Sequence, residues 1–181
     1  MIILGTNSIK ASSYDVDNSC MFDGTSSYMT KTLGTPTSAK KGTISYWFKQ
    51  GEVRTGNIKT AFSFGSEYGA INYDTGTTRG FEINLSNGNG WYKGTNEGFT
   101  AADPSAWWHL VVSVDTTQGT EANRQKVFIN GTQITSWNQE EYVAQNEDSN
   151  LNNASNNPKI GCLGNAAGTT GNFDGYMAEF H

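Results

Sequence analysis

The sequence predicts an all-β protein, a two-sheet antiparallel sandwich of jelly-roll type. About ten short segments either alternate apolar and polar side chains or carry apolar runs of strand length, which is the pattern of β-strands. The chain holds 21 Gly against 3 Pro, and its turns are built from Gly, Asn, Thr and Ser, as in tightly turning β proteins. No stretch keeps a helical period over three turns. With 181 residues, the chain suits one domain that has its own core.

Residues 107–131 predict the hairpin on which the fold is built. Apolar side chains occupy every second position from Trp108 to Val114, and polar ones such as His109 fall between them. A second strand is expected over residues 126–131, after a polar turn that is too short for a crossover helix. The two strands are therefore expected to pair antiparallel. In this arrangement we assign His109 to packing or hydrogen bonding.

The other strands follow in order along the chain. Residues 43–49 alternate in polarity over their whole length. Residues 81–85 also alternate and precede two consecutive Asn-Gly steps, which favour hairpin turns because both residue types tolerate a positive φ. Residues 137–158 are polar and rich in Asn, which predicts a long loop that is functional or covers a sheet. Further strands are expected over residues 19–29, 60–64, 91–92, 159–161 and 173–180. Three tryptophans, Trp47, Trp107 and Trp108, are assigned to the core or to sheet-face packing.

Charge and hydropathy exclude two classes of partner. The formal net charge is −5, and the Lys and Arg residues are dispersed rather than gathered in a basic stripe, so nucleic-acid binding is not expected. No window is apolar for the length that crossing a membrane requires, so no membrane insertion is expected. The apolar opening at residues 1–4 is too short and uncharged for a secretory signal peptide, and none is predicted.

The two cysteines, Cys20 and Cys162, are too few for a disulfide framework and lack the histidine partners of a zinc site. A free pair is favoured over a single bridge. Both fall in expected strands, where a cysteine commonly acts as a small buried hydrophobe.

Residues 1–18 predict an extended N-terminal arm. This segment is mostly polar and offers little apolar surface to bury, so its order would have to come from a neighbouring molecule. An arm of this kind gains order by adding a strand to a neighbour's sheet edge.

Five motifs stand in a fixed order along the chain. They are Phe-Asp-Gly at 22–24 with Tyr28 after it, residues 43–49, residues 108–115, Phe-Ile-Asn-Gly at 128–131, and Phe-Asp-Gly-Tyr-Met-Ala-Glu at 173–179. In this order they resemble the laminin-G-like jelly roll of the concanavalin A-like lectins and glucanases. Within that superfamily, residues 103–118 are most similar to a segment of tailed-bacteriophage virion proteins. The resemblance implies a laminin-G-like jelly-roll domain over residues 19–181.

The resemblance also implies a function. We expect a non-enzymatic protein on the exterior of a bacteriophage virion that binds glycans on a host or environmental surface and serves in host adhesion. Other virion proteins would be its neighbours, and a homo-oligomer within the particle is expected. The alternative is a purely structural capsid-decoration or fibre domain that acts in particle assembly, which the N-terminal arm favours.

Glycoside hydrolysis is the weakest alternative. A retaining glycosidase needs two carboxyl groups about 5 Å apart at the scissile bond. The alternating run Glu-x-Asp-x-x-Glu, which would place acids on one strand face, does not occur in this sequence. Hydrolysis would therefore need carboxylates from different strands, and we predict no catalytic residues.

The resemblance points to a structural calcium site between the two ends of the domain. Asp23 and Asp174 each precede a glycine, and Glu179 lies in the strand that the family places beside the first one. Carboxylate oxygens are the ligands that Ca²⁺ prefers. The competing interpretation is that Asp-Gly is only turn chemistry.

Aromatic and amide side chains beside the turns are the candidate ligand-binding residues. Sugar rings present apolar faces that stack on aromatic rings, and Asn pairs with hydroxyl groups. The competing interpretation is that these aromatics pack at the rim of the sandwich. The candidates are Asn89, Trp91, Tyr92, Trp137 and Tyr142.

Overall fold

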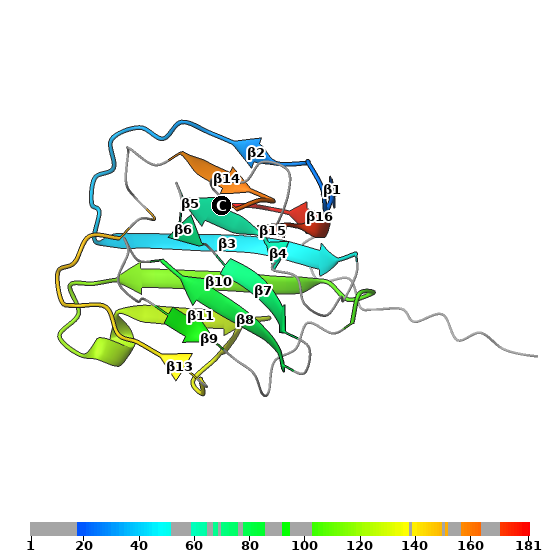
Figure 1. The fold of residues 1–181 in the computed structure, drawn as a ribbon. Helices are drawn as coiled ribbons and strands as arrows, with labels where there is room; N and C mark the ends of the chain where they lie inside the picture. Colours follow the sequence, from blue (N-terminus) through cyan, green and yellow to red (C-terminus); the bar gives the residue numbers. More distant parts are fainter. Residues whose placement is uncertain are drawn as a thin grey trace, which may run out of the picture.

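The computed structural model describes residues 18–51, 59–64, 67–68, 70–75, 78–85, 92–94, 103–137, 139–149, 151, 157–163 and 171–181. Figure 1 shows their arrangement, in which the long strands β3 and β10 run side by side across the molecule. The predicted arm lies almost wholly outside the described residues, as do the turn at residues 86–90, Asn89 and Trp91.

One layer of the fold is a six-stranded, fully antiparallel sheet, which we call the first sheet. Its long central strands, β3 and β10, pair over eight residues, from Trp108 opposite Phe48 to Asp115 opposite Lys41. The strands in spatial order are β1 (Cys20–Asp23), β16 (Asp174–Ala178), β3 (Lys41–Gln50), β10 (Trp108–Asp115), β11 (Gln125–Ile129) and β12 (Thr132–Gln133).

The opposing strands, which are mostly shorter, form two sheets rather than one. A six-stranded sheet has the order β13 (Gln139–Glu140), β9 (Tyr92–Gly94), β8 (Thr78–Asn84), β7 (Ala70–Thr75), β4 (Lys59–Thr60) and β15 (Gly171–Asn172). A four-stranded sheet has the order β2 (Met29–Thr30), β14 (Pro158–Ile160), β5 (Phe62–Phe64) and β6 (Glu67–Tyr68). Strands β5 and β6 contact β7 and β8, so the two smaller sheets adjoin. Within the described residues, only β15 and β4 pair in parallel.

The predicted all-β sandwich is confirmed, and its core follows the predicted alternation. Leu110, Val112 and Val114 of β10 are buried, and Ile44 and Phe48 are buried on the neighbouring strand. Each such side chain contributes about 1.5–3 kcal/mol by leaving water. The core side chains of the opposing sheets include Phe62, Phe64 and Ile83.

The predicted antiparallel hairpin is confirmed, and the structure supplies its register. Leu110 lies opposite Ile129 and Val112 opposite Val127. The connection between β10 and β11 contains a short 3-10 helix, η1 (Glu121–Asn123). None of the helices in the described part of the chain has the length and apolar character needed to span a membrane.

Three expectations need correction. Residues 137–158 are not only a loop, because they contain β13, and their apolar side chains Val143 and Leu151 enter the core. Both cysteines are free, but only Cys162 is buried; Cys20 is exposed. Burial raises the pKa of the Cys162 thiol. Trp107 is not a core side chain, since it is 38% exposed just before β10 begins.

Strand β16 joins the two ends of the domain, because it pairs with β1 on one side and β3 on the other. After Ala178 the chain forms a bulge at Glu179, whose φ is +50°. Beyond the bulge, the chain pairs with β3 again, shifted by one residue. The N–H of His181 donates to the Ser45 carbonyl at 2.8 Å, and the N–H of Ser45 donates back at 3.0 Å.

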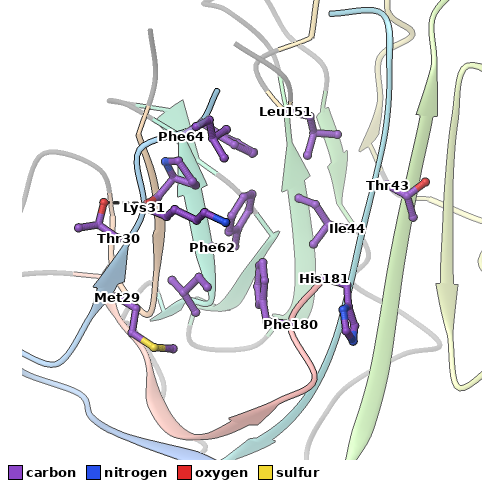
Figure 2. Close-up of a pocket in the computed structure, with 13 residues that line it drawn as sticks. Met29, Thr30, Lys31, Thr43, Ile44, Phe62, Phe64, Leu151, Phe180 and His181 are labelled. Carbon is purple, nitrogen blue, oxygen red and sulfur yellow. Dashed lines mark hydrogen bonds between the residues drawn. The ribbon is translucent and has the colours of Figure 1, made fainter. Parts of the chain in front are cut away.

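The core leaves a cavity of about 420 Å³ at the edge of the four-stranded sheet, which we call the end pocket. Figure 2 shows the side chains around it, which come from β2, β3, β5 and the chain's C-terminal end. Phe62, Phe64 and Phe180 form much of its wall.

Candidate functional site

The solvent side of the first sheet, which we call the outer face, carries a group of aromatic side chains. It is formed by the residues of β3 and β10 that alternate with the core positions, such as Trp47 and His109. On the adjoining strands, Tyr176 lies opposite Met21 of β1 and opposite Lys49 of β3. Tyr176 is 38% exposed and Met21 is 66% exposed. The outer face therefore combines apolar rings with polar neighbours on a rigid sheet.

At the centre of the outer face, the indole of Trp47 stacks on the imidazole of His109. The ring centroids are 4.7 Å apart and the planes differ by 18°. His109 Nε2 lies 2.9 Å from the hydroxyl of Ser45, and the His109 backbone N–H donates to Asn130 Oδ1 at 2.8 Å. Burial lowers the pKa of His109. These contacts fix both rings in one orientation.

A tight turn at residues 103–106 precedes Trp107, which lies next to the first residue of β10. The N–H of Ser105 donates to Asp103 Oδ1 at 2.8 Å, the Ser105 hydroxyl donates to the same oxygen at 2.6 Å, and the N–H of Ala106 donates to the Asp103 carbonyl at 3.2 Å. The hydroxyl and then the N–H of Ser105 lower the pKa of Asp103. The Asp-Pro-Ser break ahead of the hairpin is thus a turn that presents Trp107.

The aromatic candidates that the structure describes lie at a different place, near the edge formed by β9 and β13, which we call the edge surface. Gln139 pairs with Gly94 and Glu140 with Lys93, which brings the backbone of Tyr92 next to the segment that carries Tyr142. Tyr142 is 45% exposed, and a hydrogen bond with Glu140 raises its pKa.

Trp137 is partly buried and packs against the core, which matches the rim-packing interpretation for this residue. The structure therefore brings Tyr92, Trp137 and Tyr142 to one edge. Asn89 and Trp91 lie outside the described residues, so the full set stays a prediction.

A buried arginine anchors the edge surface. Arg124 donates from Nε to the carbonyl of Gln118 at 2.8 Å, from one terminal nitrogen to Val143 at 2.7 Å, and from the other to Gly119 at 3.1 Å. All three acceptors are backbone groups. Arg124 thereby ties the turn after β10 to the residue next to Tyr142.

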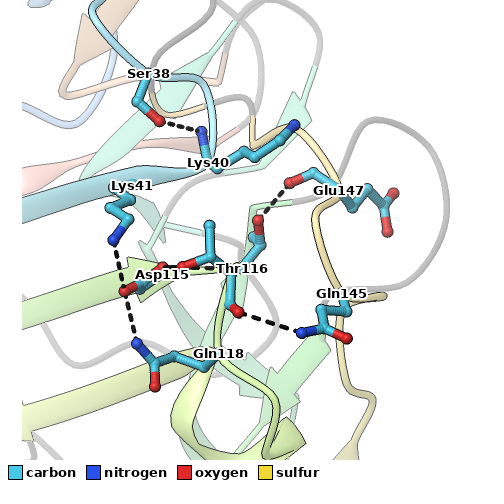
Figure 3. A network of polar contacts seen from close by, with 9 residues as sticks. Ser38, Lys40, Lys41, Asp115, Thr116, Gln118, Gln145 and Glu147 are labelled. Carbon is cyan, nitrogen blue, oxygen red and sulfur yellow. Dashed lines mark hydrogen bonds and ion pairs between the residues drawn. The ribbon is translucent and has the colours of Figure 1, made fainter.

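A polar network extends this anchoring, as Figure 3 shows. Lys41 Nζ lies 3.2 Å from Asp115 Oδ2. The hydroxyl of Thr116 donates to the Glu147 carbonyl at 2.7 Å, and the N–H of Asn146 donates to the Thr116 carbonyl at 2.9 Å. The network joins the end of β10 to residues 146–147, so its role is structural.

The predicted calcium ligands do not come together as a set. Asp23 and Asp174 lie opposite each other in register, but Glu179 follows the other end of β16. Five residues of strand separate it from Asp174 by roughly 16 Å. Among the described residues, no group of three or more His, Cys, Asp or Glu side chains is placed to hold a metal ion.

The carboxylate of Asp23 closes a turn. Its Oδ1 accepts the N–H groups of Thr25, Ser26 and Ser27 at 2.8–2.9 Å, and Oδ2 accepts the Ser26 hydroxyl at 3.0 Å. The N–H groups of Ser26 and Ser27, followed by that of Thr25, strongly lower the pKa of Asp23. This geometry fits the turn-chemistry interpretation of Asp-Gly and suits a calcium site poorly. Calcium binding stays a prediction that rests on Asp23 and Asp174.

The sequence contained one signal for the outer face. Trp107 has the same parity as His109, opposite to the buried positions of β10, and Tyr176 alternates with buried Met177 in the same way. Parity alone places these rings on the solvent side of the sheet. Their grouping required the register of β1, β16, β3 and β10.

The chain is similar to several solved structures. The chain is similar to domains LG4-5 of the mouse laminin α1 chain, with 11% identity and a TM-score of 0.55, over 96% of this chain and 44% of that one. It is also similar to the CBM40 of a Ruminococcus gnavus IT-sialidase bound to α2,3-sialyllactose, with 17% identity, a TM-score of 0.48 and 91% of each chain covered. A third similar structure is domain 4 of AbnA, an extracellular GH43 arabinanase from Geobacillus stearothermophilus, in complex with arabinotriose. The identity is 17% and the TM-score is 0.45, over 90% of this chain and 79% of that one.

The laminin similarity shows the fold alone, because its sequence identity is low, and the present chain spans less than half of that laminin chain. No curated protein matches the chain in sequence. The profile of a family described as the concanavalin A-like lectin/glucanases superfamily matches residues 23–181. The chain therefore belongs to the concanavalin A-like lectin/glucanases superfamily.

Proposed function

We propose that the chain is a non-enzymatic glycan-binding module on the exterior of a bacteriophage virion, where it serves in adhesion to the host surface. Two independent lines support the proposal. Membership in a superfamily of lectins and glucanases supports a carbohydrate ligand. The phage setting rests only on the resemblance, in sequence, of residues 103–118 to virion proteins of tailed bacteriophages.

The observation that carries the glycan proposal is the group of rings on the outer face. Trp107 and Tyr176 are exposed, and Trp47 is held by its stack on His109. Apolar ring faces of a sugar stack on such aromatics, while Ser45 and Lys49 stand within the same group to pair with hydroxyl groups. A glycan would thus be recognised by stacking on preoriented rings and by hydrogen bonds at their margin.

The edge surface is proposed as a second part of the recognition site. Tyr142 offers an exposed ring whose hydroxyl bonds to the carboxylate of Glu140. The predicted residues Asn89, Trp91, Tyr92 and Trp137 would complete this surface.

Binding without hydrolysis agrees with the positions of the acidic residues. Asp23 and Asp174 are a cross-strand carboxylate pair, but Asp23 is engaged in its turn through both oxygens. Glu140 is the last residue of β13 and bonds to the hydroxyl of Tyr142, while Glu141 follows outside the strand.

A glycan array probed with the purified chain, with and without EDTA, tests the proposal. We expect binding above background that Trp107→Ala removes while the far-UV circular dichroism spectrum is unchanged. An array without signal in both conditions would reject glycan binding. Release of reducing sugar from a polysaccharide would reject the non-enzymatic assignment.

A purely structural role in particle assembly is the second candidate. It is favoured by β1, which is an edge strand of the first sheet, follows directly on the predicted arm and exposes Met21. An edge strand offers free backbone groups to a neighbouring chain. The contacts of residues 1–18 in the assembled particle, observed by electron cryo-microscopy, would distinguish the two roles: an arm paired with another subunit favours assembly.

A further inference from the structure

The end pocket is apolar in its interior and separate from both aromatic surfaces. Buried side chains of β3 and β5 form its wall, and its volume of about 420 Å³ lies within the range of about 300–1,000 Å³ that is usual for small-molecule sites. A sugar would find few partners for its hydroxyl groups there. The deep wall consists of Ile44, Phe62, Phe64, Leu151, Ile160 and Phe180.

The rim of the end pocket carries one lysine, Lys31, and none of the thirteen lining side chains is a carboxylate. Lys31 and His181 are the titratable groups among the thirteen lining residues. His181 lies 3.4 Å from Glu179, whereas Lys31 forms no ion pair with any described residue. Figure 2 shows the Lys31 side chain reaching toward the cavity beside Phe62. The rim thus offers one ammonium group to an anionic ligand.

A second, smaller cavity of about 170 Å³ continues from the end pocket. The two cavities share Met29, Ile160 and Phe180 in their linings. The smaller cavity is less apolar than the end pocket, because Asn18, Ser19 and Glu179 also line it.

We propose that the end pocket binds a free fatty acid, with the hydrocarbon tail against the phenylalanine wall and the carboxylate at Lys31. Burial of the tail supplies the affinity, because apolar surface is removed from water in proportion to the chain length. The ammonium of Lys31 supplies selectivity for the acid over the alcohol. This binding site is independent of glycan recognition.

Isothermal titration of the full chain with octanoate, decanoate and dodecanoate, each below its micelle concentration, tests the proposal. We expect the affinity to rise about fourfold with each methylene that enters the pocket. Lys31→Met should weaken dodecanoate binding about tenfold and leave dodecanol binding unchanged. Lys126→Met, which removes an ammonium from the outer face, is the matched control and should change neither.

Leu33→Trp provides a second variant, since Leu33 is a partly buried lining residue outside the strands and a larger side chain there fills the cavity. It should abolish binding of all three acids while the melting temperature is maintained. Equal affinity for dodecanoate and dodecanol, or no loss with Leu33→Trp, would overturn the proposal.

Discussion

The outer face and the edge surface both present aromatic rings, but they are held in place by different means. On the outer face, Trp47 and Tyr176 stand on strands paired on both sides. On the edge surface, Tyr142 belongs to a segment that follows the short outermost strand β13, and Arg124 anchors the neighbouring residue Val143. One surface is oriented by sheet register and the other by a single buried side chain.

This difference bears on how each surface would bind a ligand. Rings that are already fixed lose little conformational entropy on binding, so more of the contact energy remains as affinity. The outer face is therefore expected to contribute most of the affinity, and the edge surface to adjust to the ligand. The following measurements test this division.

The largest effect is expected from Gly175→Ala, which acts on the outer face through its scaffold. Gly175 has φ +137°, and an added Cβ would stand 2.1 Å from the Lys49 carbonyl oxygen. We expect a loss of about 3 kcal/mol or more in the free energy of unfolding, measured by urea denaturation. Gly34→Ala is the control, since nothing lies within 4 Å of its added Cβ; an equal loss there would contradict the steric explanation.

Arg124→Met is expected to cost about 2–3 kcal/mol, because three backbone carbonyls lose a charged donor. Hydrogen exchange should then increase at residues 141–149 and stay unchanged in β3. Uniform acceleration over the whole chain would show that the arginine supports the fold in general rather than the edge surface.

Trp107→Ala is expected to weaken glycan binding about 30-fold, or about 2 kcal/mol, if the outer face supplies most of the affinity. Tyr142→Ala should weaken it by less than about threefold. Both variants can be compared by titration with a glycan identified on the array. A larger loss of affinity with Tyr142→Ala than with Trp107→Ala would show that the edge surface supplies most of the affinity.

Lowering the pH is expected to reduce the free energy of unfolding through protonation of His109, which lies on the outer face. Because burial lowers the pKa of His109 in the folded chain, the unfolded chain takes up its proton first. The contribution to stability is present above the ordinary histidine pKa of about 6.5 and is lost as the pH falls through the lower folded value. Urea denaturation of the wild type and of His109→Gln between pH about 7 and about 5 should show a steeper decline for the wild type. Parallel curves would mean that His109 does not couple to folding.

Calcium is expected to have the smallest effect. The oxygens of Asp23 are already bonded within their turn, so calcium should shift the melting temperature of the wild type by about 1 °C or less. A rise of several degrees that Asp174→Asn removes would show that the two carboxylates do hold the ion.

Alternation of polarity was sufficient to predict the core of the first sheet and its hairpin, because each strand there has one buried and one exposed face. It could not predict that the opposing strands form two sheets, since the register of β5, β7 and β14 is set by contacts between distant segments. The burial of Val143 could not be predicted either, because one buried apolar residue in a polar stretch forms no alternating pattern. The role of Arg124 was invisible because its partners are backbone carbonyls, which no side-chain pattern records.

The position of β16 between β1 and β3 also has a consequence for biosynthesis. During translation, β1 and β3 leave the ribosome long before β16, the strand that pairs with both of them. Contacts between such distant segments form slowly, and the unpaired strands meanwhile expose backbone groups and apolar side chains. We therefore expect the first sheet to close only after translation has passed residue 178, and nascent chains stalled before β16 to depend on chaperones for solubility.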